Sequence, residues 1–126
     1  MNGKTRAFGL LAALAFATLA APTAQAQVVP QACGLYANTP YRTSNWIEAD
    51  GGRNGCVDVV NIHVRIRHQK RFQPDETIAE HFVTAANHDA HLSFPCFGIS
   101  ERWKVFTETI VGAQKPKSPV VELPCA

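Results

Sequence analysis

Apolar and polar side chains alternate with a period of two along residues 60–67. The apolar members of this pattern are Val60, Ile62, Val64 and Ile66, and the polar members are Asn61, His63, Arg65 and Arg67. Successive side chains of a β-strand point to opposite faces of its sheet. The alternation therefore predicts a strand with one buried and one solvated face.

Four other segments have the composition of strands. Residues 92–96 and 121–125 each place three apolar side chains on one face. Residues 103–111 carry β-branched and aromatic side chains on both faces, which predicts a strand at the centre of a sheet. Residues 75–87 could form a helix capped by Asp75, but they lie among strands and contain Phe-Val-Thr, so we predict a strand at about residues 77–85.

Turn-forming residues separate these segments. They lie at residues 50–55, 73–76, 87–90 and 112–119. Six or seven short strands joined by such turns are typical of an all-β domain. We predict a small antiparallel β-sandwich, immunoglobulin-like or related.

The first 26 residues have the pattern of a secretory signal peptide. Lys4 and Arg6 precede the apolar run of residues 7–21, and Ala-Gln-Ala at residues 24–26 presents the small side chains that signal peptidase requires. We expect cleavage after Ala26 and secretion to the extracellular space. The run is shorter than the roughly 20 residues of a spanning helix, so no membrane insertion is expected after cleavage.

Loss of this leader changes the charge of the chain. The full sequence has 12 Lys plus Arg and 10 Asp plus Glu, and removal of Lys4 and Arg6 leaves ten of each. A nucleic-acid-binding domain carries a clear positive excess, so nucleic acid is not an expected partner. Residues 27–126 suffice for a single secreted domain with one core.

Four cysteines follow the leader, and they are Cys33, Cys56, Cys96 and Cys125. An even number in a short exported chain predicts two disulfides. The spacings of 23, 40 and 29 residues leave no close pair to clamp an ion, so we expect no metal and no other cofactor. We favour Cys33–Cys56 with Cys96–Cys125, and a Cys56–Cys96 bridge between sheets is the main alternative.

The order of "GGRNGC", "VRIRHQKRFQPDETIAE" and "WKVFTETIVGAQKPKSPVVELPC" resembles a group of small secreted proteins common in actinomycetes. The resemblance covers nearly all of residues 27–126. It departs at Phe72 and Gln73, because members carry tryptophan just before the following proline. The resemblance implies a bacterial two-disulfide β-sandwich that is exported. The group has no assigned activity and supplies no catalytic residue.

The basic run "HVRIRHQKR" contains the strongest candidate binding residues, which are Arg65, Arg67, Lys70 and Arg71. No acidic residue lies between Val59 and Pro74, so the local charge is +4. Arginine offers paired donors in a fixed fork that suits phosphate and carboxylate groups. The alternative is a solvated strand face whose cations meet glutamates on neighbouring strands.

Two other sets of side chains suggest ligands. Trp46 and Tyr41 lie in a polar segment and could form a sugar-stacking platform, although Trp46 could equally close the end of the sandwich. Imidazoles together with Asp89 could bind zinc or copper, and they belong to His81, His88 and His91. Their spacing near a turn does not converge them, so metal binding is the weaker interpretation.

No arrangement of residues indicates an enzyme. None of the serines stands in a strained glycine-flanked turn beside a base, and the cysteines are expected to be oxidised. We expect a secreted, non-enzymatic binding module for an anionic envelope polymer or an acidic partner. The alternatives are a protease inhibitor that presents Lys115 or Lys117 in the loop of residues 112–120, and a carrier of a small ligand.

Overall fold

The alternating segment forms the ten-residue strand β4 (Val60–Gln69) in the computed structural model, which describes residues 32–96 and 101–124. The side chains of Ile62, Val64 and Ile66 are at most 1% exposed, so the predicted buried face is confirmed. The predicted signal peptide lies outside the described residues.

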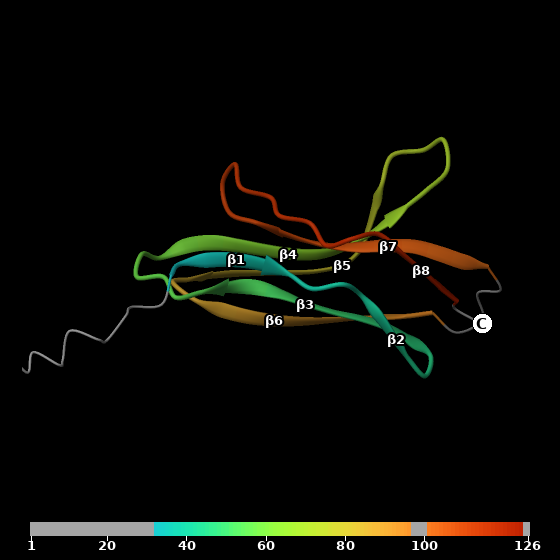
Figure 1. Ribbon diagram of the computed structural model, residues 1–126, viewed down its shortest axis with the longest axis horizontal. Helices are drawn as coiled ribbons and strands as arrows, with labels where there is room; N and C mark the ends of the chain where they lie inside the picture. The colour runs from blue at the N-terminus through green and yellow to red at the C-terminus, as the bar shows by residue number, and fades with distance from the viewer. Residues whose placement is uncertain (1–31, 97–100, 125–126) are drawn as a thin grey trace, which may run out of the picture. The chain divides into compact units, whose positions relative to one another are not determined.

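Two antiparallel sheets form the domain (Figure 1). Sheet B has the order β5-β4-β7-β8, with β5 (Glu76–Ala85), β7 (Arg102–Ile110) and β8 (Val121–Pro124) around β4. In sheet A, β3 (Trp46–Asn54) pairs with β6 (His88–Pro95) on one side and with β1 (Gly34–Ala37) and β2 (Tyr41–Thr43) on the other. The prediction of an all-β, sandwich-like antiparallel fold is confirmed. The predicted central position of residues 103–111 is also confirmed, because β7 lies between β4 and β8.

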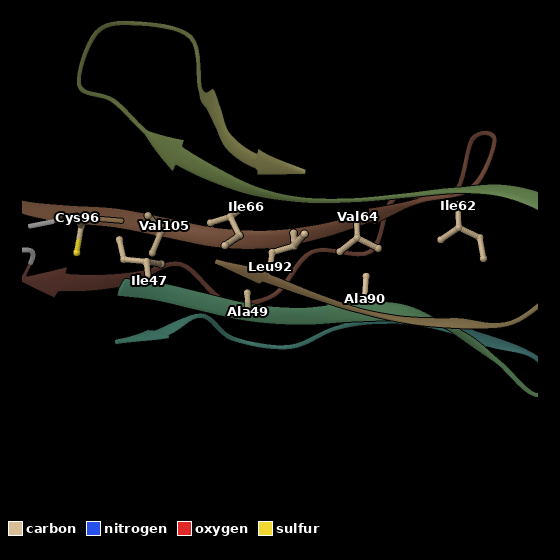
Figure 2. Close-up of a cluster of buried hydrophobic side chains, with 9 residues drawn as sticks. All are labelled: Ile47, Ala49, Ile62, Val64, Ile66, Ala90, Leu92, Cys96 and Val105. Atoms are coloured by element: carbon tan, nitrogen blue, oxygen red, sulfur yellow. The ribbon is translucent and has the colours of Figure 1, made fainter. Parts of the chain in front are cut away.

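The core lies between the sheets, where side chains of the two layers point toward one another (Figure 2). Its buried members are Ile47, Ala49, Ala90 and Leu92 from sheet A, Ile62, Val64, Ile66 and Val105 from sheet B, and Cys96. Most of these side chains are small or β-branched, which suits two pleated surfaces in close contact.

The glycine pair Gly51 and Gly52 contradicts the turn predicted at residues 50–55, because both residues lie within β3. A Cβ atom at Gly51 would lie 2.7 Å from Thr109 Oγ1 and 2.8 Å from Val64 Cγ1 in the opposite sheet. A Cβ atom at Gly52 would overlap the backbone carbonyl of His88 in β6. Gly51 therefore makes room for side chains of the opposite sheet and Gly52 for the backbone of β6, and turn statistics cannot distinguish either role from a true turn.

Of the two predicted disulfides, Cys33–Cys56 is confirmed, with a Cα–Cα distance of 4.4 Å. The alternative Cys56–Cys96 pairing is therefore wrong. The structure does not show the second predicted bridge: Cys96 is a buried free thiol, and Cys125 lies outside the described residues.

The far end of the β4–β5 hairpin rises away from the two layers (Figure 1). The register of the two strands shifts there, because Ile66 faces Ala79 whereas the next residue, Arg67, faces Thr77. One extra residue, Ile78, is thus inserted into β5, and a bulge of this kind bends a strand out of its sheet. We call residues 70–75, which connect β4 to β5, the arm.

Candidate functional site

The tip of the arm exposes a large aromatic ring. The side chain of Phe72 is 92% exposed, and its backbone has a φ of 58°. This left-handed conformation is unfavourable for a bulky residue. The guanidinium of Arg71 lies 5.1 Å from the centre of the Phe72 ring, so the tip presents a cation and an aromatic ring together.

A groove of about 1070 Å³ lies between the arm and the strands β7 and β8. Lys70, Arg71 and Asp75 line it from the arm, and Arg102 and Lys104 line it from β7. No pattern in the sequence predicts this groove directly. It exists because the bulge turns the arm away from the sheet, and a bulge leaves little trace in an alternating pattern.

The cations of the groove differ in their partners. Lys70 Nζ lies 2.8 Å from Glu76 Oε2, and this hydrogen bond lowers the pKa of the Glu76 carboxyl. Arg102 forms a weaker ion pair of 3.3 Å with Glu122.

In residues 32–96 and 101–124, by contrast, neither Arg71 nor Lys104 has a carboxylate partner. Asp75 and Glu101 also line the groove, so its charge is mixed. Arg71 and Lys104 are therefore the groove cations best placed to receive an anionic group from outside.

An aromatic stack forms one wall of the groove. The rings of His68 and Trp103 lie parallel at 3.9 Å, and Phe94 of sheet A lies 5.5 Å from Trp103. Burial lowers the pKa of His68, so its imidazole is neutral at pH 7. His68 Nδ1 and Trp103 Nε1 are buried without a hydrogen-bond partner. The stack closes the core at the point where the groove begins.

The predicted basic cluster divides into two parts. Arg65 Nε donates to Glu108 Oε1 at 2.6 Å, and Glu108 is only 3% exposed. Arg67 donates to Thr77 Oγ1 at 2.7 Å. These two arginines therefore support sheet B, whereas Lys70 and Arg71 lie on the arm.

Trp46 lies on the outer face of sheet A. Its neighbour Ile47 is fully buried, so alternation directs Trp46 outward, where its side chain is 42% exposed. Tyr41 of β2 has the same orientation and is 44% exposed. The structure thus brings together the two aromatic residues that the sequence suggested as a platform.

The three histidines proposed as metal ligands do not converge. The rings of His81 and His88 stack at a centroid distance of 5.1 Å. His91 instead bridges two carboxylates, with Nδ1 at 2.7 Å from Asp50 and Nε2 at 2.8 Å from Glu48. Within the described part of the chain, no group of three or more His, Cys, Asp or Glu side chains has the arrangement of a metal site.

The loop that carries Lys115 and Lys117 folds back on β7. The amide of Ser118 donates to the carbonyl of Thr107 at 2.9 Å, and that of Thr109 donates to Pro116 at 3.1 Å. Lys117 Nζ also lies 3.9 Å from the buried carboxylate of Glu108. The loop is therefore held against the sheet on the side of Lys117, while Lys115 is exposed.

These features define a small all-β domain with a projecting arm, a groove of mixed charge and an exposed aromatic face. No protein-family model matches the chain, and no curated protein matches it at a significant level. No helix in residues 32–96 and 101–124 has the length and apolar character to cross a membrane. The function must therefore be argued from the surfaces themselves.

Proposed function

We propose that this protein is an exported, non-enzymatic binding domain that captures an anionic partner in the groove beneath its arm. The observation that carries the proposal is the pair of cations, Arg71 and Lys104, that line the groove without a carboxylate partner among the described residues. These two cations are not engaged in an ion pair within the described residues, so they can bind an anionic group of a partner.

Phe72 supports the same surface. Exposed aromatic rings beside arginine are enriched at binding hot spots, because they offer a large rigid contact area. An unfavourable backbone conformation at an exposed residue also favours a functional role over a structural one. The partner is thus expected to present acidic groups to the groove and an apolar surface to the tip of the arm.

Export is part of the proposal. The pattern of residues 1–26 supports cleavage after Ala26, and the Cys33–Cys56 disulfide suits an oxidising compartment. An anionic envelope polymer and an acidic protein share the chemistry that the groove would recognise. The experiment below distinguishes the polymer from the acidic protein.

The test is sedimentation of the protein with purified anionic cell-envelope polymer across a salt series, alongside retention on immobilised poly-L-glutamate. We expect binding that weakens with salt and falls at least tenfold in the variant Arg71→Ala/Lys104→Ala. Lys115→Ala is the control for Arg71→Ala, because it removes an exposed cation far from the groove lining.

Retention by the polymer alone would assign the ligand to the envelope, and retention by poly-L-glutamate alone would assign it to an acidic protein. Equal losses in Arg71→Ala and Lys115→Ala would reject the groove as the site. Failure of the wild-type protein to bind either probe would reject the proposal.

A further inference from the structure

The outer face of sheet A carries aromatic rings and carboxylates but has a different chemistry from the groove. In the antiparallel pairing of β2 with β3, Tyr41 lies opposite Glu48 and Thr43 lies opposite Trp46. Tyr41 and Trp46 therefore project from the same face. Their positions are separated by two residues along β3, which is about 7 Å.

Carboxylates surround this aromatic pair and are already oriented. The imidazole of His91 holds Glu48 and Asp50 at 2.8 and 2.7 Å, and the Tyr36 hydroxyl donates to Asp89 Oδ1. Burial raises the pKa of the Tyr41 hydroxyl, and the nearby charges of Asp50 and Glu48 raise it further. Each carboxylate oxygen has two lone pairs, so these groups can accept further hydrogen bonds.

From this arrangement we propose that the outer face of sheet A binds a neutral polysaccharide, which stacks on Tyr41 and Trp46 and donates hydroxyl groups to Glu48 and Asp50. A pyranose ring has an apolar C–H face that packs on an aromatic ring and hydroxyls around its edge that donate to carboxylates. The donors that fix the carboxylates are present before the ligand arrives, which lowers the entropy lost on binding. A sheet face is broad and nearly flat, so it suits an extended polymer.

A basic peptide is a poorer fit to the same surface. His91 uses both ring nitrogens on the carboxylates, and these contacts raise its pKa and favour its charged form. The imidazolium thus offsets part of the acidic charge that would attract lysine or arginine. Sugar hydroxyls need acceptor oxygens in fixed positions, which these contacts provide.

The test is affinity electrophoresis of the whole protein in gels that contain cellulose derivatives, xylan, mannan or galactan. We expect at least one of these polymers to retard the wild-type protein and to quench tryptophan fluorescence. Trp46→Ala should weaken the retardation at least tenfold, whereas Trp46→Phe should stay within a few-fold of wild type because it keeps an aromatic ring.

Phe82→Ala is the matched control, because Phe82 is an exposed aromatic residue, 65% exposed, on the other sheet. It should leave the retardation unchanged. Arg71→Ala/Lys104→Ala should also bind the polysaccharide normally, which separates this site from the groove. Thermal unfolding of each variant checks that the fold is intact.

Three results would overturn the inference. The first is that no polymer of the panel retards the wild-type protein. The second is equal retardation of Trp46→Ala and Phe82→Ala. The third is occupation of the face by something else, shown by tighter binding of a lysine-rich peptide or by a monomer–dimer equilibrium that Trp46→Ala abolishes.

Discussion

Phe72 combines an exposed ring with a backbone conformation that glycine adopts more readily. The left-handed conformation costs a non-glycine residue about 1–2 kcal/mol. Glycine loses more entropy on folding, which cancels part of this gain. We therefore expect Phe72→Gly to raise the free energy of unfolding by roughly 0.5–1 kcal/mol, measured by urea denaturation.

Ser44 provides the control, because its φ of 54° makes it the other described non-glycine residue with a left-handed backbone. Ser44→Gly should stabilise the fold by a similar amount. Only Phe72→Gly should also weaken the anionic binding, because Ser44 lies in the β2–β3 turn, away from the arm. A destabilised Phe72→Gly would contradict the cost of the left-handed backbone, and one that binds normally would contradict a functional role for the ring.

His91 should titrate above the ordinary imidazole pKa of 6.5. The hydrogen bond with Asp50 is the largest cause, followed by that with Glu48. A pKa raised by folding means that the protonated form stabilises the fold. This contribution is complete below pH 6.5 and is lost as the pH rises through the higher pKa of the folded state.

Nuclear magnetic resonance of the His91 ring gives this pKa directly. In Asp50→Asn the pKa of His91 should fall toward 6.5, because the hydrogen bond with Asp50 is the largest cause of its rise. The hydrogen bond with Glu48 remains in this variant. A wild-type pKa at or below 6.5 would mean that the carboxylates do not hold the imidazole in solution.

At the scale of elements, the ion pair of Arg65 and Glu108 joins the two central strands of sheet B. Removal of Arg65 leaves the buried Glu108 carboxylate with only the more distant Lys117, 3.9 Å away, which is more harmful than removal of both Arg65 and Glu108. Arg65→Met should therefore destabilise the fold by about 2–3 kcal/mol, slightly less than a fully buried pair because Arg65 is partly exposed. Urea denaturation measures the loss.

The double variant Arg65→Met/Glu108→Leu should recover most of this stability, because neither charge remains in the sheet. Arg67→Met is the control and should cost only about 1 kcal/mol, since Arg67 donates a single hydrogen bond to Thr77. If the double variant is less stable than Arg65→Met, the two side chains do not act as a pair.

Strands with strict alternation could be predicted from the sequence, and β4 is the clearest example. β3 could not, because its inward positions include Gly51, which is small only to admit Thr109 and Val64 from the other sheet. That contact joins residues far apart in the chain, so it cannot be predicted from the local composition. Without that contact, the pattern of Gly51 and Gly52 predicts a turn.

The candidate sites show the same limit. A run of four cations predicted one patch. Arg65, however, donates to Glu108, which is 43 residues away in the sequence, and therefore stabilises the fold. Trp46 and Tyr41 could be identified from their polar surroundings. Lys104 and Asp50 could not be assigned to a site, because strand register alone brings them there. His91 could be identified only as a possible metal ligand, whereas in the structure it binds Asp50 and Glu48.

At the scale of the whole domain, the two sheets present different chemistry to the solvent. The outer face of sheet A carries Glu48, Asp50 and Asp89 beside aromatic rings, whereas the arm and groove of sheet B offer Arg71 and Lys104. The two proposals together place a neutral polymer on one side of the domain and an anionic partner on the other. Simultaneous binding would raise the apparent affinity for a surface that presents both.

The second disulfide is a prediction for the whole chain, because it would join the end of β6 to the segment after β8. Leu123 packs against the core cluster that contains Cys96, and Cys125 follows Leu123 by two residues in the sequence. We expect protein secreted under oxidising conditions to take up no iodoacetamide when it is denatured without reductant. After reduction it should take up four labels, one for each cysteine beyond the leader.

The variant Cys125→Ser should expose one thiol in denaturant and lower the free energy of unfolding by about 2–4 kcal/mol, because the bridge restricts the unfolded chain. Cys56→Ser is the matched control, since it opens the Cys33–Cys56 bridge, which closes a loop of similar length. Two labels on the denatured, unreduced wild-type protein would mean that Cys96 and Cys125 stay reduced. The stability of the domain would then depend on the Cys33–Cys56 bridge and the packed core alone.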